Sequence, residues 1–485
     1  MTANWVSMIP LVVVIVISLW TKQVLIGLGI GLVIGAWLLT PSIMPMLDTL
    51  LHYLYLELLV PGNLHLLVFL YLFGAFIGLL RASGGIQGFI HWLEPWTRTR
   101  RRAYGVLWLS SLWTAMAPDF RILAIGPLLS KGLAKNAADA LRAGVVLTAT
   151  ATPIAALLPL GTIFVGYMVG LCALAAHSVH YAGSAYSLFL ATLPFNFFAW
   201  AILLWGVWQS FFTREKKAQR PRTMAVRVGQ LSLQGEWGAL GVGGSGEHQM
   251  AVRSQVIEST TAPHVLHFLV PMILLWALTL VFTYFSGVSY AHSLMGSFLH
   301  ADASKAMMQA LFATLAVSML FLRIRGESFG NLTKAALAGG NEMMPVVLLL
   351  TLVWAVAGVA TALGFTHWVT AALGAKLPRP FVLPLLFATA SVLSYFLGST
   401  FGVWGLLLPI AVSLTTATGV SLVFTLAAIF AGGTLGGFAS PLSDNTATLA
   451  LVLDRPVMAL ARPLLLPALL AGGVALAFYF ALGWA

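Results

Sequence analysis

The sequence predicts an all-α polytopic membrane protein made of two inverted-topology repeats, each with a re-entrant hairpin and a broken transmembrane helix. Of the 485 residues, 60% are hydrophobic and only 8% are charged, and apolar runs of membrane-crossing length follow one another along the chain. Glycine and proline interrupt these runs at corresponding places in two halves. A long polar stretch separates the halves, so we expect repeats at residues 1–212 and 264–485 and a linker at 213–263.

The first half begins with two apolar runs, residues 5–20 and 24–39, joined by a short turn that contains Lys22. No basic residue precedes the first run, so we expect a membrane helix and not a cleaved signal peptide. Residues 64–80 form the next span. The basic cluster at 98–102 then marks the cytoplasmic face by the positive-inside rule.

A hairpin and a broken helix complete the first half. Residues 104–129 are apolar but are interrupted at 117–121 by the sequence Ala-Pro-Asp-Phe-Arg, and both ends carry basic flanks. This pattern predicts a re-entrant hairpin that enters and leaves the membrane on one side. Threonines and a proline at 148–153 interrupt the next run, 143–176, which predicts one long broken spanning helix. Residues 185–212 return to the basic side.

The linker at 213–263 is basic and then glycine-rich, which is typical of a segment of low order. We expect it in the cytoplasm of a multi-pass protein of the bacterial cell (inner) membrane.

The second half repeats the pattern of the first. Its predicted spans are residues 266–285, 306–322 and 343–363, followed by a hairpin at 381–414, a broken helix at 422–453 and a last span at 463–482. Alternating the side at each crossing places the basic loops on one face and opens the two hairpins to opposite sides. Interrupted segments at matching places in two halves indicate the substrate site of a secondary carrier.

The break at residues 440–446, Ser-Pro-Leu-Ser-Asp-Asn-Thr, is the strongest candidate for that site. Four glycines precede it and Pro441 cannot continue a helix, so backbone groups are freed at membrane depth. An ionisable residue there is costly to bury, which makes Asp444 a candidate to bind a cation or a proton. The alternative is a simple kink with Asp444 reaching the membrane interface.

With both halves laid out, the sequence resembles the NhaC-type Na⁺/H⁺ antiporter family, a branch of the ion transporter superfamily of inverted-repeat secondary carriers. Residues 398–410 resemble the family's second hairpin, G-[ST]-[ST]-W-G-T-F-G…P-I, and residues 440–446 resemble its S-P-[IL]-S-D-T-T segment. The chain departs from the family where G-D-H-C is replaced by residues 436–439, Gly-Gly-Phe-Ala. In the first hairpin it loses the family's acidic pair in register, although it keeps Asp119 and adds Arg121, and in the first broken helix it lacks the family's aspartate.

The resemblance implies cation/proton antiport by alternating access, with Asp444 binding either Na⁺ or H⁺ and nearby oxygens completing the shell. The family segments and their symmetry-related counterparts supply the candidate residues. The candidate ion- or substrate-binding residues are Asp444, Asn445, Ser443, Ser440, Thr446, Ser399, Thr400, Thr150, Thr152, Asp119 and Arg121, and the helix-breaking residues are Pro153, Pro441, Gly398 and Gly402.

Arg121 supports an alternative function. A guanidinium at membrane depth can hold the carboxylate of an amino acid or organic anion, with Na⁺ or H⁺ as the coupling ion. The simpler interpretation of Arg121 is an internal ion pair with Asp119 or another carboxylate.

Several other classes of function are disfavoured. The net charge of +11 sits in short loops, where it sets topology, so we expect no nucleic acid. With a single cysteine, Cys172, we expect neither disulfides nor thiolate metal sites to stabilise the protein. The absence of a GxxxxGK[ST] nucleotide-binding loop disfavours a pump. No histidine lies near Ser443, so we expect no enzyme. We expect no cofactor and no metal beyond Na⁺ at Asp444; the partners are membrane lipid and a small cation or organic solute, and the resemblance adds a homodimer.

Overall fold

The computed structural model describes residues 5–132, 137–213, 262–289, 293–373 and 376–484. Every regular element in these ranges is a helix, which confirms the predicted all-α class. Most of the linker predicted at 213–263 lies outside the described residues.

The helices of the first half follow the predicted spans, with additional breaks. They are η1 (Trp5–Met8), α1 (Ile9–Thr21), α2 (Val24–Leu39), α3 (Ile43–Leu59), α4 (Pro61–Ala82), α5 (Gly85–Leu93), η2 (Glu94–Thr97), α6 (Arg100–Thr114), α7 (Pro118–Gly132), α8 (Ala137–Ala149), α9 (Thr152–Leu157), α10 (Ile163–Ser178), α11 (Ala185–Thr192), η3 (Leu193–Phe195) and α12 (Phe197–Phe211).

The second half carries the following helices. They are α14 (Leu266–Gly287), α15 (Leu294–His300), α16 (Ala303–Ile324), α17 (Phe329–Glu342), α18 (Met344–Ala362), α19 (Phe365–Leu373), α20 (Arg379–Leu397), α21 (Thr400–Thr418), α22 (Leu422–Ala439), α23 (Asp444–Leu453) and α24 (Val457–Leu482).

Many of these helices are long and apolar enough to cross a membrane. Within the described ranges, eight helical segments of at least 18 residues meet both criteria, and a bent pair, 185–195 with 197–211, adds a ninth. Several of them also expose large apolar side chains, such as Leu204 on α12 and Leu466 on α24, which a lipid environment would cover. The chain is therefore a multi-pass membrane protein.

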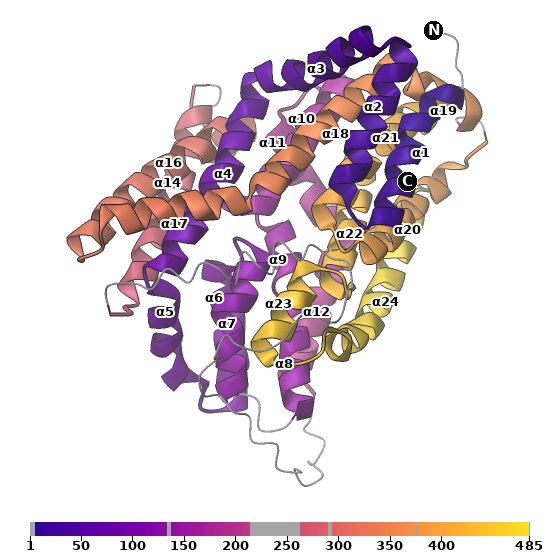
Figure 1. The fold of residues 1–485 in the computed structure, drawn as a ribbon. Helices are drawn as coiled ribbons and strands as arrows, with labels where there is room; N and C mark the ends of the chain where they lie inside the picture. The colour runs from indigo at the N-terminus through magenta and orange to yellow at the C-terminus, as the bar shows by residue number, and fades with distance from the viewer. Residues whose placement is uncertain (1–4, 133–136, 214–261, 290–292, 374–375, 485) are drawn as a thin grey trace.

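The two halves place a helical hairpin before a broken helix, as predicted. In the first half α6 and α7 form the hairpin and α8 and α9 the broken helix; in the second half α20 and α21 precede α22 and α23. Figure 1 shows α6 and α7 in the lower part of the molecule and α20 and α21 in the upper part. The arms of the first hairpin have 15 residues each and those of the second have 19, so the second hairpin reaches further along the bundle.

The prediction of one broken helix across residues 143–176 is wrong in detail, because the chain is interrupted twice there. The first interruption lies at 150–151 as expected. The second lies at 158–162, where Pro159 is followed by Gly161 with a φ of +71°. That backbone conformation favours glycine, and Thr162 then starts α10 by accepting a hydrogen bond from the Val165 N–H.

A close crossing joins α4 to α17. Gly74 and Gly78 on α4 face Gly339 on α17, and a Cβ added at any of the three would run into the backbone of the opposite helix. An ion pair also joins the two helices, with Arg81 Nη1 lying 2.6 Å from Glu342 Oε2. Small residues that permit direct backbone contact are a common device for joining helices in membranes.

Candidate functional site

The two broken helices meet at the side chain of Asn445. Its Nδ2 donates hydrogen bonds to Thr152 Oγ1 at 2.6 Å and to the Gly437 carbonyl at 3.0 Å. Thr152 begins α9 in the first half, while Gly437 lies near the end of α22 and Asn445 near the start of α23. One amide therefore connects the break in the first repeat with both sides of the break in the second, as the inverted-repeat prediction requires.

The hydroxyl groups of the second break hold its own backbone. Ser440 Oγ donates to the Tyr395 carbonyl on α20 at 2.6 Å, and Thr446 Oγ1 donates to the Ser440 carbonyl at 2.8 Å. Ser443 caps α23 by accepting from the Thr446 N–H, and its own hydroxyl donates to the Ser440 carbonyl. All three are buried, and these bonds satisfy the Ser440 carbonyl, which has no intrahelical donor because α22 ends there.

The tip of the second hairpin packs against the same break. Gly398 ends α20 with a φ of +68°, and a Cβ there would meet the Leu442 backbone. Ser399 caps α21 by accepting from the Gly402 N–H at 3.0 Å. Thr400 is buried. A Cβ added to Gly437 would clash with the Thr400 hydroxyl and would lie 3.0 Å from the Thr152 methyl group. The predicted residues Thr152, Thr400 and Asn445 thus surround Gly437.

Arg121 lies wholly buried at the first break and bonds only neutral groups. Its Nε and Nη2 donate to Thr150 Oγ1 at 3.2 and 2.8 Å. Nη1 donates to Thr114 Oγ1 and Nη2 to the Leu107 carbonyl, both at 2.7 Å. The ion pair with Asp119 considered above is not formed in this structure. The guanidinium instead clamps both arms of the first hairpin to the break at Thr150, and one Nη1 hydrogen remains uncommitted.

The two candidate carboxylates lie nearer to solvent than the hydroxyls around them. Asp444 is exposed, whereas Asn445, the next residue, is buried. Asp444 occupies the first turn of α23, where the helix dipole favours negative charge. Asp119 is half-buried in the first turn of α7. The remaining helix-breaking residue, Pro153, is buried at the second position of α9.

The buried part of the site is rich in oxygen atoms and carries no carboxylate. Thr152 Oγ1, the Gly437 carbonyl and the Oδ1 of Asn445 are hydroxyl, carbonyl and amide oxygens, the kinds of ligand that hard cations accept. Arg121 adds a fixed positive charge beside Thr150, which suits an anionic group. The arrangement can therefore hold a small cation, a carboxylate, or both.

Sequence reasoning missed the groups that hold Arg121. Thr114 and the Leu107 carbonyl lie on the other arm of the hairpin, 7 and 14 residues before the arginine. Because the predicted hairpin brings its two arms together, the hydroxyl of Thr114, seven residues before Arg121, could have been recognised from the sequence as a partner of the arginine. It also missed Gly437 as the point where three segments meet. Four glycines precede the break, and nothing in the sequence distinguishes Gly437 from the other three.

Comparisons with known proteins agree with the carrier fold. Residues 155–484 match a family described as the Na⁺/H⁺ antiporter family. An uncharacterized protein of Haemophilus influenzae is 21% identical over 458 residues, covering 91% of this chain and 83% of that protein. The crystal structure of the Alcanivorax borkumensis YdaH transporter, described as having an unusual topology, matches with a TM-score of 0.61 and 18% identity, covering 92% of this chain and 90% of that one.

The matched family range has a direct bearing on the site. It includes the second hairpin and the second broken helix, with Asn445 and Asp444, while Thr152 and Arg121 precede it. The match spans more than half of the chain, and the resemblance read from residues 398–410 and 440–446 is confirmed. The chain belongs to the Na⁺/H⁺ antiporter family.

Proposed function

We propose that this secondary transporter exchanges a small inorganic cation, Na⁺ above all, for protons by alternating access, with Asp444 binding either ion. The observation that carries the proposal is the position of Asp444. It is the exposed carboxylate at a helix break, and the residue after it, Asn445, reaches the crossing of the two broken helices. A carboxylate so placed can exchange ions with water, and it directly precedes the residue that reaches the buried oxygens.

The neighbouring oxygens support a cation site. The Gly437 carbonyl, Thr152 Oγ1 and Asn445 Oδ1 come from three different helical segments. A cation bound among them would draw α9, α22 and α23 together, and its loss would release them. This gives a physical link between occupancy and movement of the repeats, because a ligand shifts a conformational equilibrium only through contacts that differ between states.

Proton movement in response to cations tests this function. The full chain is reconstituted in liposomes that contain a pH-sensitive dye, and Na⁺, Li⁺ and K⁺ are added in separate pulses. We expect Na⁺ to dissipate an imposed pH gradient, with protein-free liposomes as the control. A gradient that survives all three pulses contradicts cation/proton antiport.

A second candidate function rests on Arg121. Its buried guanidinium has hydroxyl and carbonyl partners and no carboxylate partner among the described residues. A buried charge normally has a counter-charge, which the carboxylate of an amino acid or organic anion would supply. In this case Na⁺ or H⁺ would be the coupling ion. The same liposomes, given a panel of amino and carboxylic acids, distinguish the two functions, since only the second predicts a signal that depends on an organic solute.

The remaining expectations stay proposals. We propose that the protein lies in the bacterial inner membrane as a homodimer, with the 213–263 linker in the cytoplasm, and that it uses no cofactor beyond its coupling ions. Both functions above describe transport without chemical conversion of the solute.

Gly437 provides a prediction about the geometry of the site. A Gly437→Ala substitution adds a Cβ that meets Thr400 Oγ1 and approaches the Thr152 methyl group to 3.0 Å. We expect it to separate the second hairpin from the first break, to reduce transport at least about tenfold, and to lower the free energy of unfolding by about 1–3 kcal/mol. Uptake in liposomes and thermal unfolding in detergent measure the two effects.

Gly473 on α24 offers the matched control. It is exposed, and a Cβ built there meets nothing within 4 Å. Gly473→Ala should leave transport unchanged and should stabilise the helix slightly, since alanine is the better helix former. Equal behaviour of the two variants contradicts the close packing assigned to Gly437.

A further inference from the structure

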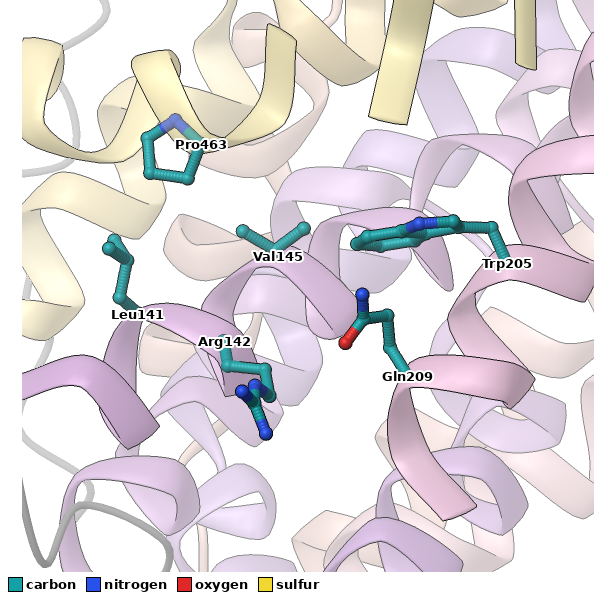
Figure 2. A pocket seen from close by; sticks show the side chains of 6 residues that line it. All are labelled: Leu141, Arg142, Val145, Trp205, Gln209 and Pro463. Carbon is teal, nitrogen blue, oxygen red and sulfur yellow. The ribbon is translucent and has the colours of Figure 1, made fainter. Parts of the chain in front are cut away.

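A cavity of about 230 Å³ lies between α8, α12 and α24, apart from the ion site. Its lining combines one cation and one amide with four largely apolar side chains, as Figure 2 shows. The lining residues are Leu141, Arg142, Val145, Trp205, Gln209 and Pro463. None of the functional proposals above uses these residues.

Both polar side chains of this cavity, Arg142 and Gln209, carry hydrogen-bond donors. Arg142 is half-buried, and its guanidinium makes no hydrogen bond or ion pair within the described part of the chain. Figure 2 shows the amide of Gln209 turned toward the space between Arg142 and Trp205, where its NH₂ group can donate, and the Thr213 hydroxyl donates to its Oε1 at 3.2 Å. Among the lining residues that the structure describes there is no carboxylate, so a group that enters the cavity gains most if it is anionic and rich in acceptors.

The walls beside these donors suit an amphiphile. Trp205 lies along one side of the cavity, with Leu141, Val145 and Pro463 along the others. The adjoining outer surfaces of α12 and α24 are apolar and exposed: Leu204 is 70% exposed and Leu466 is 65% exposed. An acyl chain lying against these surfaces would have its head group at the cavity.

Exposed or loop-contacting basic residues lie close to the cavity. Arg462, which directly precedes Pro463, is exposed, and Arg100 Nη2 contacts the Thr213 carbonyl at the end of α12 at 3.5 Å. Basic residues cluster at the cytoplasmic ends of membrane helices, and basic pockets between such helices bind anionic head groups. We propose that this cavity binds the phosphate of an anionic phospholipid head group, held by Arg142 and Gln209, with Trp205 against the glycerol region.

Binding there would act on the ion site through α8. Val145 lines the cavity, and α8 ends only four residues later at Ala149, just before the break at Thr150. A head group between α8, α12 and α24 would brace the helix that carries the first break. Anionic lipid is therefore expected to change the rate of transport as well as to bind.

Lipid retention by the full chain tests the proposal. Delipidated protein in detergent is titrated with phosphatidylglycerol or phosphatidylcholine, and bound lipid is counted by native mass spectrometry. We expect wild type to prefer phosphatidylglycerol by at least about tenfold, as one charge-assisted pair allows. Arg142→Gln should remove this preference, and Leu141→Trp, which fills the cavity but keeps the charge, should reduce lipid binding. Arg101→Gln is the control, because Arg101 is exposed on the same basic face and does not line the cavity.

Three results would overturn the proposal. Wild type could show no head-group preference, or Arg142→Gln and Leu141→Trp could bind lipid as wild type does. In the third, inorganic phosphate binds in an Arg142-dependent manner while no lipid is retained, which would assign the cavity to a soluble anion.

Discussion

Replacing Asp444 with asparagine is expected to abolish cation-driven proton movement, leaving the pH signal at the level of protein-free liposomes. Asparagine has nearly the same size and can still occupy the first turn of α23. It cannot bind a proton or balance the charge of a cation, so both halves of the exchange are lost. Because Asp444 is exposed, we expect the free energy of unfolding to change by no more than about 1 kcal/mol.

Asp454 supplies a matched control for this variant. It is an exposed aspartate at the other end of α23, where it adopts a left-handed conformation with a φ of +49°. Asparagine tolerates that conformation, so Asp454→Asn should keep both its fold and its transport. Normal exchange by Asp444→Asn would rule out this carboxylate as the shared ion site.

Replacing Arg121 with lysine is expected to give the second large effect. Lysine keeps the positive charge but has no planar fork, so it cannot reach Thr114, Thr150 and the Leu107 carbonyl together. We expect a loss of about 2–4 kcal/mol in the free energy of unfolding, since at least one buried acceptor loses its donor. Thermal unfolding in detergent measures this loss.

Transport by the same variant separates the two proposed functions. If Arg121 binds a substrate carboxylate, Arg121→Lys should lower organic-acid uptake at least about tenfold at temperatures where it remains folded. If Arg121 only clamps the hairpin, Thr150→Val, which removes one partner of the guanidinium, should reproduce the whole effect. Arg101→Lys, on the exposed basic face, should match wild type in both assays.

The sequence was sufficient for the fold class and for most breaks. The apolar runs predict the membrane spans. Gly398 and Pro441 predict interruptions, because glycine's tolerance of a positive φ and proline's missing N–H are properties of the residue itself and do not depend on distant contacts. The second interruption in 143–176 has the same kind of signal at Pro159 and Gly161. The prediction placed a single break at the threonine-rich residues 148–153 and did not use that signal.

The details of the site depend on contacts that sequence does not reveal. Asp444 and Asn445 are adjacent, and neighbours on a helix point about 100° apart, so only the packing of α23 decides which one is buried. Asp444 was expected at the centre of the oxygen shell, but Asn445 occupies the crossing. Likewise Arg121 was expected to pair with a carboxylate, whereas the fold presents hydroxyls and a carbonyl from the facing arm.

The glycine contact between α4 and α17 limits which helices can move when the transport site changes its exposure from one side of the membrane to the other. Sliding one helix along the other by a turn would push side chains into a gap that admits only hydrogen atoms, and would also pull Arg81 from Glu342. Such a step therefore has a steric barrier. A ligand bound at Asn445 would not lower it directly, because Asn445 lies on α23 and not at this crossing. We therefore expect α4 and α17 to move together as one rigid body. The hinges of the transport cycle should lie at the glycine and proline breaks of the other helices.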